Sequence, residues 1–407
     1  RDVERSRGLG DVYKRQLREE VRRLQEEIHG FRHNSFPQCG ADTVAPYVPH
    51  HFIHRLGIEA RPQYVFPTNP FLLKFRPNTC ADRIYGGAYQ GFGLAFTTFG
   101  DKKQLGDPMT FYVFQGARIA RFNPRLSLNY EWNFGISAGW KPYDNDYNSY
   151  NGAVGSRVNA YLNAGIYLNW SLSRYFDFII GGDFTHFSNG NTKFPNAGVN
   201  TTGAKIGLVY NFNREEADLT KSLVHPYVPR FPRHVSYDLV LFGSWRRKGV
   251  YVGEKQIASP GSYPVAGFNF APMYNLNYKL RFGVSLDGVY DGSANVYTED
   301  ALVEYDAGSG SSRRKFLVPG IQNQLALGLS GRAEYVMPFF TIGVGLGTNV
   351  LGRGDLRGLY QVFALKINVT RSSFLHIGYN LQDFQTPNYL MLGLGFRFNN
   401  KYPKVRH

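Results

Sequence analysis

The stretch "LSLNYEWNFGISAGW", residues 126–140, decides the fold class of this chain. Its even positions are apolar from Leu126 to Trp140, whereas its odd positions carry Ser, Asn, Glu and Gly. A period of two places these two sets of side chains on opposite faces of a β-strand. The same alternation returns near residues 158–170, 325–335, 363–369 and 390–398. We therefore predict an all-β protein.

Segment and loop lengths separate a membrane barrel from a soluble sandwich, which also alternates. The alternating segments reach the roughly 9–11 residues that a tilted membrane-spanning strand needs, whereas soluble strands usually have about 5–6. Very short turns alternate with long polar connections, which we place at 143–157, 189–199, 247–261, 292–321 and 349–357. Long outer loops and short periplasmic turns are typical of outer-membrane proteins. We therefore predict a transmembrane antiparallel β-barrel.

The strand count is predicted as about 14–16. Six strands are expected between residues 82 and 213 and eight between 235 and 399, and a hairpin around the turn "PTNP" (67–70) would add two. "VAPYVPHHF" from Val44 is echoed by "VHPYVPRF" from Val224, so the chain divides into two similar halves. The halves form either one wide barrel or two tandem eight-stranded barrels. We prefer one barrel, because lipid does not tolerate open sheet edges and a single closure is the commoner solution.

The predicted divisions follow from these patterns. "DVYKRQ" (11–16) resembles the translation of a transposon end used in sequencing libraries, and no signal peptide is visible after it. We expect an artefact at 1–16, a leader at 17–50, a barrel half carrying the candidate site at 51–213, a linker at 214–234, a second set of barrel strands at 235–400 and a tail at 401–407.

Composition excludes several function classes. The 407 residues contain no long apolar run, and the mean hydropathy is −0.33, which excludes helical membrane spans. The net charge of +15 comes from scattered Lys and Arg without a nucleic-acid-binding motif, so we predict no nucleic-acid partner and favour anionic lipid head groups. Cys39 and Cys80 allow at most one disulfide and no metal site.

A histidine and a serine stand on the lipid-facing parity of the strand predicted at 175–188. His186 and Ser188 share the parity of Phe184, whereas Asp183 points into the barrel. On the following strand Asn200 falls on the outer face, beside His186. Residues i and i+2 of one strand face are about 6.5–7 Å apart, and a serine beside a histidine base is suited to acyl transfer. Facing lipid, such a pair would act on a membrane lipid.

"HFSN" (186–189) followed by "PNAG" (195–198) resembles the lipid A 3-O-deacylase family, PagL, and the related acyloxyacyl hydrolases. The resemblance covers roughly residues 54–213. It implies a Gram-negative outer-membrane location, lipid A or lipopolysaccharide and other outer-membrane lipids as partners, and no metal or organic cofactor.

The resemblance also implies a role for each matching residue. His186 is the expected general base and Ser188 the nucleophile, while Asn189, Asn196 and the backbone N–H groups of the loop, including Gly190, form the oxyanion region. Asn200 stands where the family has an acidic residue. An amide orients a histidine but cannot stabilise the imidazolium by charge, and an Asp-to-Asn change in a serine protease lowers the rate about 10⁴-fold.

Three hypotheses follow. The first is a serine esterase that removes an ester-linked acyl chain from lipid A. The second is a non-catalytic channel, transporter or structural barrel that retains an idle motif, which Asn200 and the second set of strands both favour. A phospholipase is a more distant third. The oligomeric state is not predicted.

Overall fold

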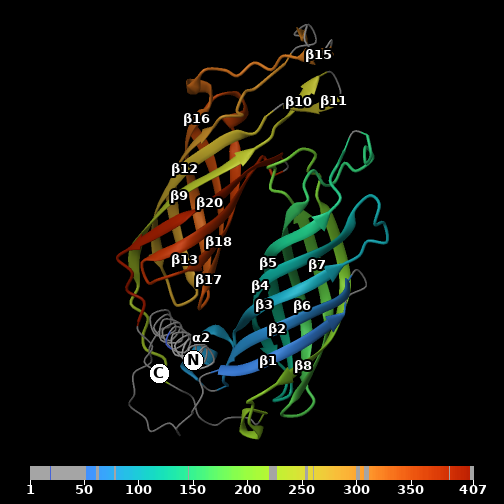
Figure 1. Cartoon of the computed structure of the whole chain (residues 1–407). Coiled ribbons are helices and arrows are strands. Elements are labelled where there is room, and N and C mark those ends of the chain that lie inside the picture. The colour runs from blue at the N-terminus through green and yellow to red at the C-terminus, as the bar shows by residue number, and fades with distance from the viewer. Residues whose placement is uncertain are drawn as a thin grey trace, which may run out of the picture.

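A computed structural model of the chain arranges the barrel strands in two separate closed barrels (Figure 1). The structure describes residues 19, 52–60, 64–77, 79–144, 146–219, 227–252, 255–259, 261–298, 303–306, 311–384 and 386–403. The expected artefact and almost all of the leader, as well as the first copy of the echo from Val44 up to residue 51, lie outside these residues.

The first barrel closes strands β1 to β8 in chain order, with β1 paired to β8. Its strands are β1 (Phe52–Ala60), β2 (Tyr64–Phe75), β3 (Tyr89–Thr97), β4 (Gly106–Arg121), β5 (Leu126–Trp140), β6 (Val158–Ser171), β7 (Phe176–Ser188) and β8 (Val199–Asn211).

Helix α2 (Cys80–Tyr85) joins β2 to β3. Thr79 caps its N-terminus, and Gly86 ends it at φ 70°. Cys80 is disulfide-bonded, which fits an oxidising compartment, while Cys39 lies outside the described residues.

The second barrel closes β9 onto β20. Its strands are β9 (His234–Arg246), β12 (Tyr263–Asn275), β13 (Leu280–Asp291), β16 (Leu325–Val336), β17 (Phe340–Leu351), β18 (Leu359–Asn368), β19 (Ser373–Gln382) and β20 (Thr386–Phe398). Two small hairpins extend from its loops: β10 (Gly249–Val252) with β11 (Lys255–Ala258), and β14 (Val303–Asp306) with β15 (Ser311–Arg314). Short 3₁₀ helices are η1 (Glu216–Leu219), η2 (Ile321–Asn323) and η3 (Gly354–Leu356).

The preference for one wide barrel is wrong, and the alternative of two tandem eight-stranded barrels is confirmed. Backbone hydrogen bonding closes each half on itself, so no sheet edge needs a partner from the other half. Large inward side chains fill the narrow interior that eight strands enclose; Phe114, Tyr161 and Phe187 are fully buried in the first barrel. The predicted turn "PTNP" is also wrong, because β2 runs through residues 67–70.

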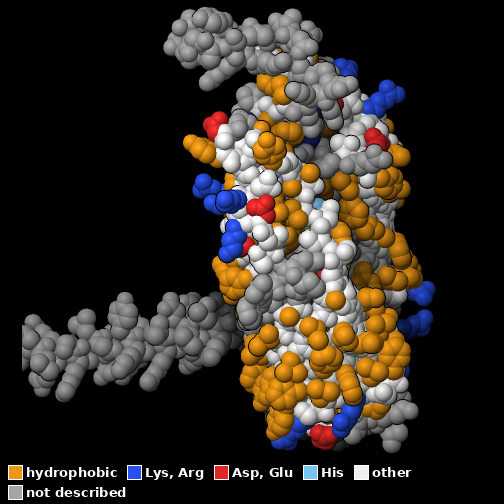
Figure 2. Space-filling model, turned by 90° about the vertical axis from the view of Figure 1, so that its right-hand side faces the viewer, with side chains coloured by type: hydrophobic (Ala, Val, Ile, Leu, Met, Phe, Trp, Pro, Cys, Tyr) orange, Lys and Arg blue, Asp and Glu red, His pale blue; other side chains and the backbone are white. Residues whose placement is uncertain are grey.

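The outer faces are apolar, as the alternation predicts. Ile166 on β6 is 57% exposed, and similarly exposed side chains cover the nearby strands, including Ile136 on β5, Ile180 on β7 and Leu208 on β8. Figure 2 shows hydrophobic side chains gathered over the face of the molecule that it presents. Among the described residues no helix is long and apolar enough to cross a membrane.

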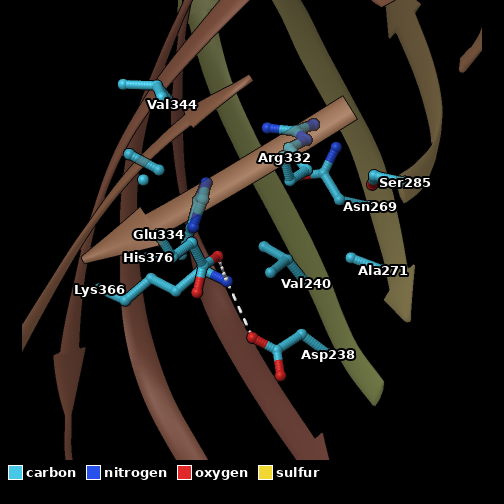
Figure 3. Close-up of a pocket in the computed structure, with 12 residues that line it drawn as sticks. Asp238, Val240, Asn269, Ala271, Ser285, Arg332, Glu334, Val344, Lys366 and His376 are labelled. Carbon is cyan, nitrogen blue, oxygen red and sulfur yellow. Dashed lines mark hydrogen bonds and ion pairs between the residues drawn. The ribbon is translucent and has the colours of Figure 1, made fainter. Parts of the chain in front are cut away.

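The interiors hold paired charges. In the first barrel Lys205 lies 2.9 Å from a Glu131 oxygen and 3.4 Å from a Glu59 oxygen. In the second barrel Lys366 bridges Asp238 and Glu334 at 2.8 and 2.6 Å (Figure 3). Pairing is what makes buried charges tolerable, because an unpaired one carries the full desolvation cost.

The two barrels lie side by side (Figure 1). The ring of Phe340, at the start of β17, meets the ring of Trp132 midway along β5 edge to face, with centroids 5.2 Å apart. At the long-loop end, Asn191 Nδ2 donates to Asn388 O at 3.1 Å. The barrels therefore contact one another at two levels, with their long loops on the same side (Figure 1).

Candidate active site

His186 and Ser188 lie at the C-terminal end of β7, and their side chains point away from the barrel interior. His186 pairs with Leu162 and Ser188 with Ala160 on β6. Phe187 between them is 1% exposed and faces the interior, so its two neighbours face outward. The alternation read from the sequence therefore assigns both side chains to the correct face.

Asn200 lies directly opposite His186 in the β7–β8 ladder. Its Oδ1 is 2.6 Å from His186 Nδ1. When Nδ1 carries the proton and donates it to this oxygen, Nε2 keeps a lone pair and can act as a base. The amide thereby selects the tautomer that a serine nucleophile needs, without adding a negative charge.

Ser188 and His186 share the outer face without a direct bond. No hydrogen bond joins their side chains in the described part of the chain. In serine–histidine sites this bond is often loose until substrate binds, and residues i and i+2 of a strand face are close enough for it to form.

Asp183 cannot replace Asn200 in this arrangement. Its side chain is 9% exposed and belongs to the inward-facing set of β7. The side chain that contacts His186 on the outer face is instead the Asn200 amide on β8.

The loop at 189–198 is held by its own asparagines. Asn189 N–H donates to Asn196 Oδ1 at 2.9 Å, and Asn189 Nδ2 donates to Lys193 O at 3.0 Å. Asn189 is buried, and Gly190 and Asn191 follow it at φ 63° and 66°. The structure thus brings Asn189 and Asn196 together, where they shape the loop that begins immediately after Ser188.

Gly198 is a site residue that sequence reasoning missed. It has φ 76°, and its N–H donates to Ala153 O at 3.0 Å. A Cβ at this position would lie 3.0 Å from both His186 Cε1 and Phe187 O. Glycine therefore leaves the space that the imidazole occupies. The signal was present as the final letter of "PNAG", but only the fold shows what the glycine touches.

Two closed barrels with apolar outer faces and ion-paired interiors define an outer-membrane β-barrel protein, here with a histidine, a serine and an asparagine on its lipid-facing side. Residues 76–209, which contain all three, match the family model described as lipid A 3-O-deacylase (PagL). Residues 235–400 match the model described as acyloxyacyl hydrolase, C-terminal domain. The chain belongs to the lipid A 3-O-deacylase (PagL) family, and its location is the Gram-negative outer membrane.

Solved structures give weaker comparisons. They include CdiB from Escherichia coli (10% identity, 89% of this chain, 66% of that chain, TM-score 0.19), an outer-membrane channel from Pseudomonas putida F1 (10%, 88%, 98%, 0.16) and outer membrane phospholipase A from Escherichia coli (8%, 88%, 100%, 0.17). The chain spans just under two thirds of the length of CdiB. TM-scores this low carry no argument. A comparison with curated proteins finds no match.

Proposed function

We propose that this chain is an outer-membrane serine esterase that hydrolyses an ester-linked acyl chain of lipid A. The observation that carries the proposal is the 2.6 Å contact between His186 Nδ1 and Asn200 Oδ1 on the outer face. His186 lies two residues before Ser188 on the same face of β7. The contact lies within the part of the chain that matches the lipid A 3-O-deacylase model. Lipid A belongs to the outer membrane, which the face carrying His186, Ser188 and Asn200 would contact.

The proposed reaction has two halves. Ser188 Oγ attacks the acyl carbonyl while its proton passes to His186 Nε2. The C–O ester bond breaks, the proton goes to the departing alcohol oxygen of lipid A, and an acyl-enzyme remains. Water, deprotonated by His186, then releases the fatty acid and restores Ser188. These steps require no metal or organic cofactor.

The loop after Ser188 supplies the proposed oxyanion region. The attacked carbonyl oxygen gains negative charge, which preorganised N–H groups stabilise. We assign this task to the N–H of Gly190, because the N–H of Asn189 already donates to Asn196 Oδ1 and holds the loop in shape.

The outer face suits a substrate that stays in the bilayer. Leu162 on β6 and Phe184 on β7 lie beside and below the site, and both are exposed. An acyl chain that reaches Ser188 from the membrane would lie along these side chains, so its carbonyl would approach without leaving the bilayer.

The rival hypothesis of a non-catalytic barrel is favoured by Asn200, because this residue carries no charge. A channel function has less support, because paired charges and aromatic side chains occupy both barrel interiors. A cavity of about 20 Å³ between Asp238 and His376 in the second barrel has room for little more than one water.

Lipid A from a Gram-negative host tests the proposal. The host expresses the chain, with both cysteines retained, behind a bacterial signal peptide, and extracted lipids are examined by mass spectrometry. We expect lipid A to lose one acyl chain, and Ser188→Ala and His186→Ala to abolish the loss. Ser372→Ala, in a turn of the second barrel, serves as the matched control and keeps full activity.

Two results would overturn the proposal. One is unchanged lipid A from a protein that is inserted and folded, as judged by heat-modifiable migration. The other is acyl loss from phospholipids instead of lipid A in the same extracts, which would assign the chain to the phospholipases.

A further inference from the structure

The loop at 189–198 is bound to the second barrel as well as to its own. Asn191 Nδ2 donates to Asn388 O at 3.1 Å, and Asn191 O accepts from Arg247 N at 3.2 Å. A Cβ placed on Gly190 would lie 3.6 Å from Leu390 side-chain carbons, so the loop backbone packs against that leucine. Gly190 is only two residues beyond Ser188.

The partners in the second barrel are themselves held. Asn388 Oδ1 accepts from the Arg246 guanidinium, and Asn388 Nδ2 donates to Asn380 Oδ1 at 3.0 Å. Arg246 in turn pairs with buried Asp291 at 2.8 Å. The backbone carbonyl that receives Asn191 therefore belongs to a strand fixed by buried polar contacts on neighbouring strands.

The second barrel contacts the loop where its backbone is left-handed. Gly190 and Asn191 are consecutive left-handed residues. A non-glycine residue in this region costs about 1–3 kcal/mol and persists when surrounding contacts determine it. Two hydrogen bonds on Asn191 come from the second barrel. These two bonds therefore add to the hydrogen bonds that the asparagines make within the loop.

We infer that the second barrel is a positioning element of the active site. Through Asn388 and Leu390 it holds the loop at 189–198, which carries the proposed oxyanion N–H group. This inference rests on the proposed function for its catalytic consequence. A loop that sits correctly places its N–H groups at the developing charge, whereas a misplacement of about 1 Å can cost on the order of a hundredfold in rate. The second barrel then serves the chemistry without contributing a reacting group.

Two variants remove the support in different ways. Asn191→Gly deletes the side-chain amide but accepts the left-handed conformation, and Leu390→Ala deletes the packing under Gly190. Leu394→Ala is the matched control, because Leu394 lies on the same strand and the same outer face but is 55% exposed. A nitroxide on Lys193→Cys reports loop motion, since Lys193 is exposed and the native Cys80 is disulfide-bonded.

We expect both variants to mobilise the label and to lower kcat for deacylation about tenfold to a hundredfold with KM unchanged, while the control behaves like the parent. Unchanged label motion in both variants would overturn the anchoring, and mobilised labels with unchanged kcat would overturn its catalytic role. A parent protein that is folded but inactive on lipid A would end the proposed function, whereas the label would still decide whether the second barrel holds the loop.

Discussion

Asn200→Asp should increase the rate of lipid A deacylation. The substitution keeps the size and shape of the side chain and replaces a neutral oxygen, 2.6 Å from His186 Nδ1, with a carboxylate. When His186 takes the proton of Ser188 it becomes an imidazolium, and only the carboxylate stabilises that charge by Coulombic attraction. Because the two residues are directly opposite in the ladder, no backbone movement is needed.

The expected magnitude follows from the geometry. Two unit charges about 4 Å apart attract by about 4 kcal/mol at an effective dielectric constant near 20. Asn200 is exposed, so we halve this value to about 2 kcal/mol for screening by the interface. At 1.36 kcal/mol for each tenfold change, the gain is about 30-fold. This is well below the roughly 10⁴-fold loss for the reverse change in a serine protease, whose aspartate is buried.

The assay is the initial rate of fatty acid release from lipid A by purified, refolded protein in mixed micelles. Asn200→Asp combined with Ser188→Ala is the control, and it should abolish the release. If the folded Asn200→Asp protein is no faster than the parent, Asn200 is not the third member of the triad. If the rate gain persists with Ser188→Ala, Ser188 is not the nucleophile.

Three other substitutions probe the site, the interior and the lipid face. Gly198→Ala should lower the deacylation rate at least tenfold in a folded protein, because its methyl would press on the His186 ring and force left-handed strain; full activity would show that the ring has other room. Lys205→Met should reduce the free energy of unfolding in denaturant by about 3–5 kcal/mol, because it leaves the Glu131 carboxylate buried without its cation, and an unchanged midpoint would contradict that reading. Ile166→Arg should cost about 2–4 kcal/mol in lipid bilayers if that face meets the membrane core, whereas a neutral outcome would place it elsewhere.

Local alternation was enough to determine the barrel strands from residue 82 onward and the orientation of the site, whereas it misplaced the turn before β2. Parity in 126–140 and 175–188 assigns each side chain to the lipid or to the interior, because a strand has only two faces. For the same reason it places His186, Ser188 and Asn200 outside and Asp183 inside. The family motif then predicts a role for each of the three outward-facing residues.

The closure of the barrels and the shape of the loop were decided by tertiary structure. Alternation is identical in one wide barrel and in two narrow ones, and only the pairing of β1 with β8 separates them. The support of Asn191 by Asn388 joins residues 197 positions apart, and no local pattern reports such a contact. Sequence alone therefore determined which face carries the His186–Ser188 pair, whereas packing between the two barrels decided what holds the loop beside it, because long-range contacts depend on how completed sheets meet.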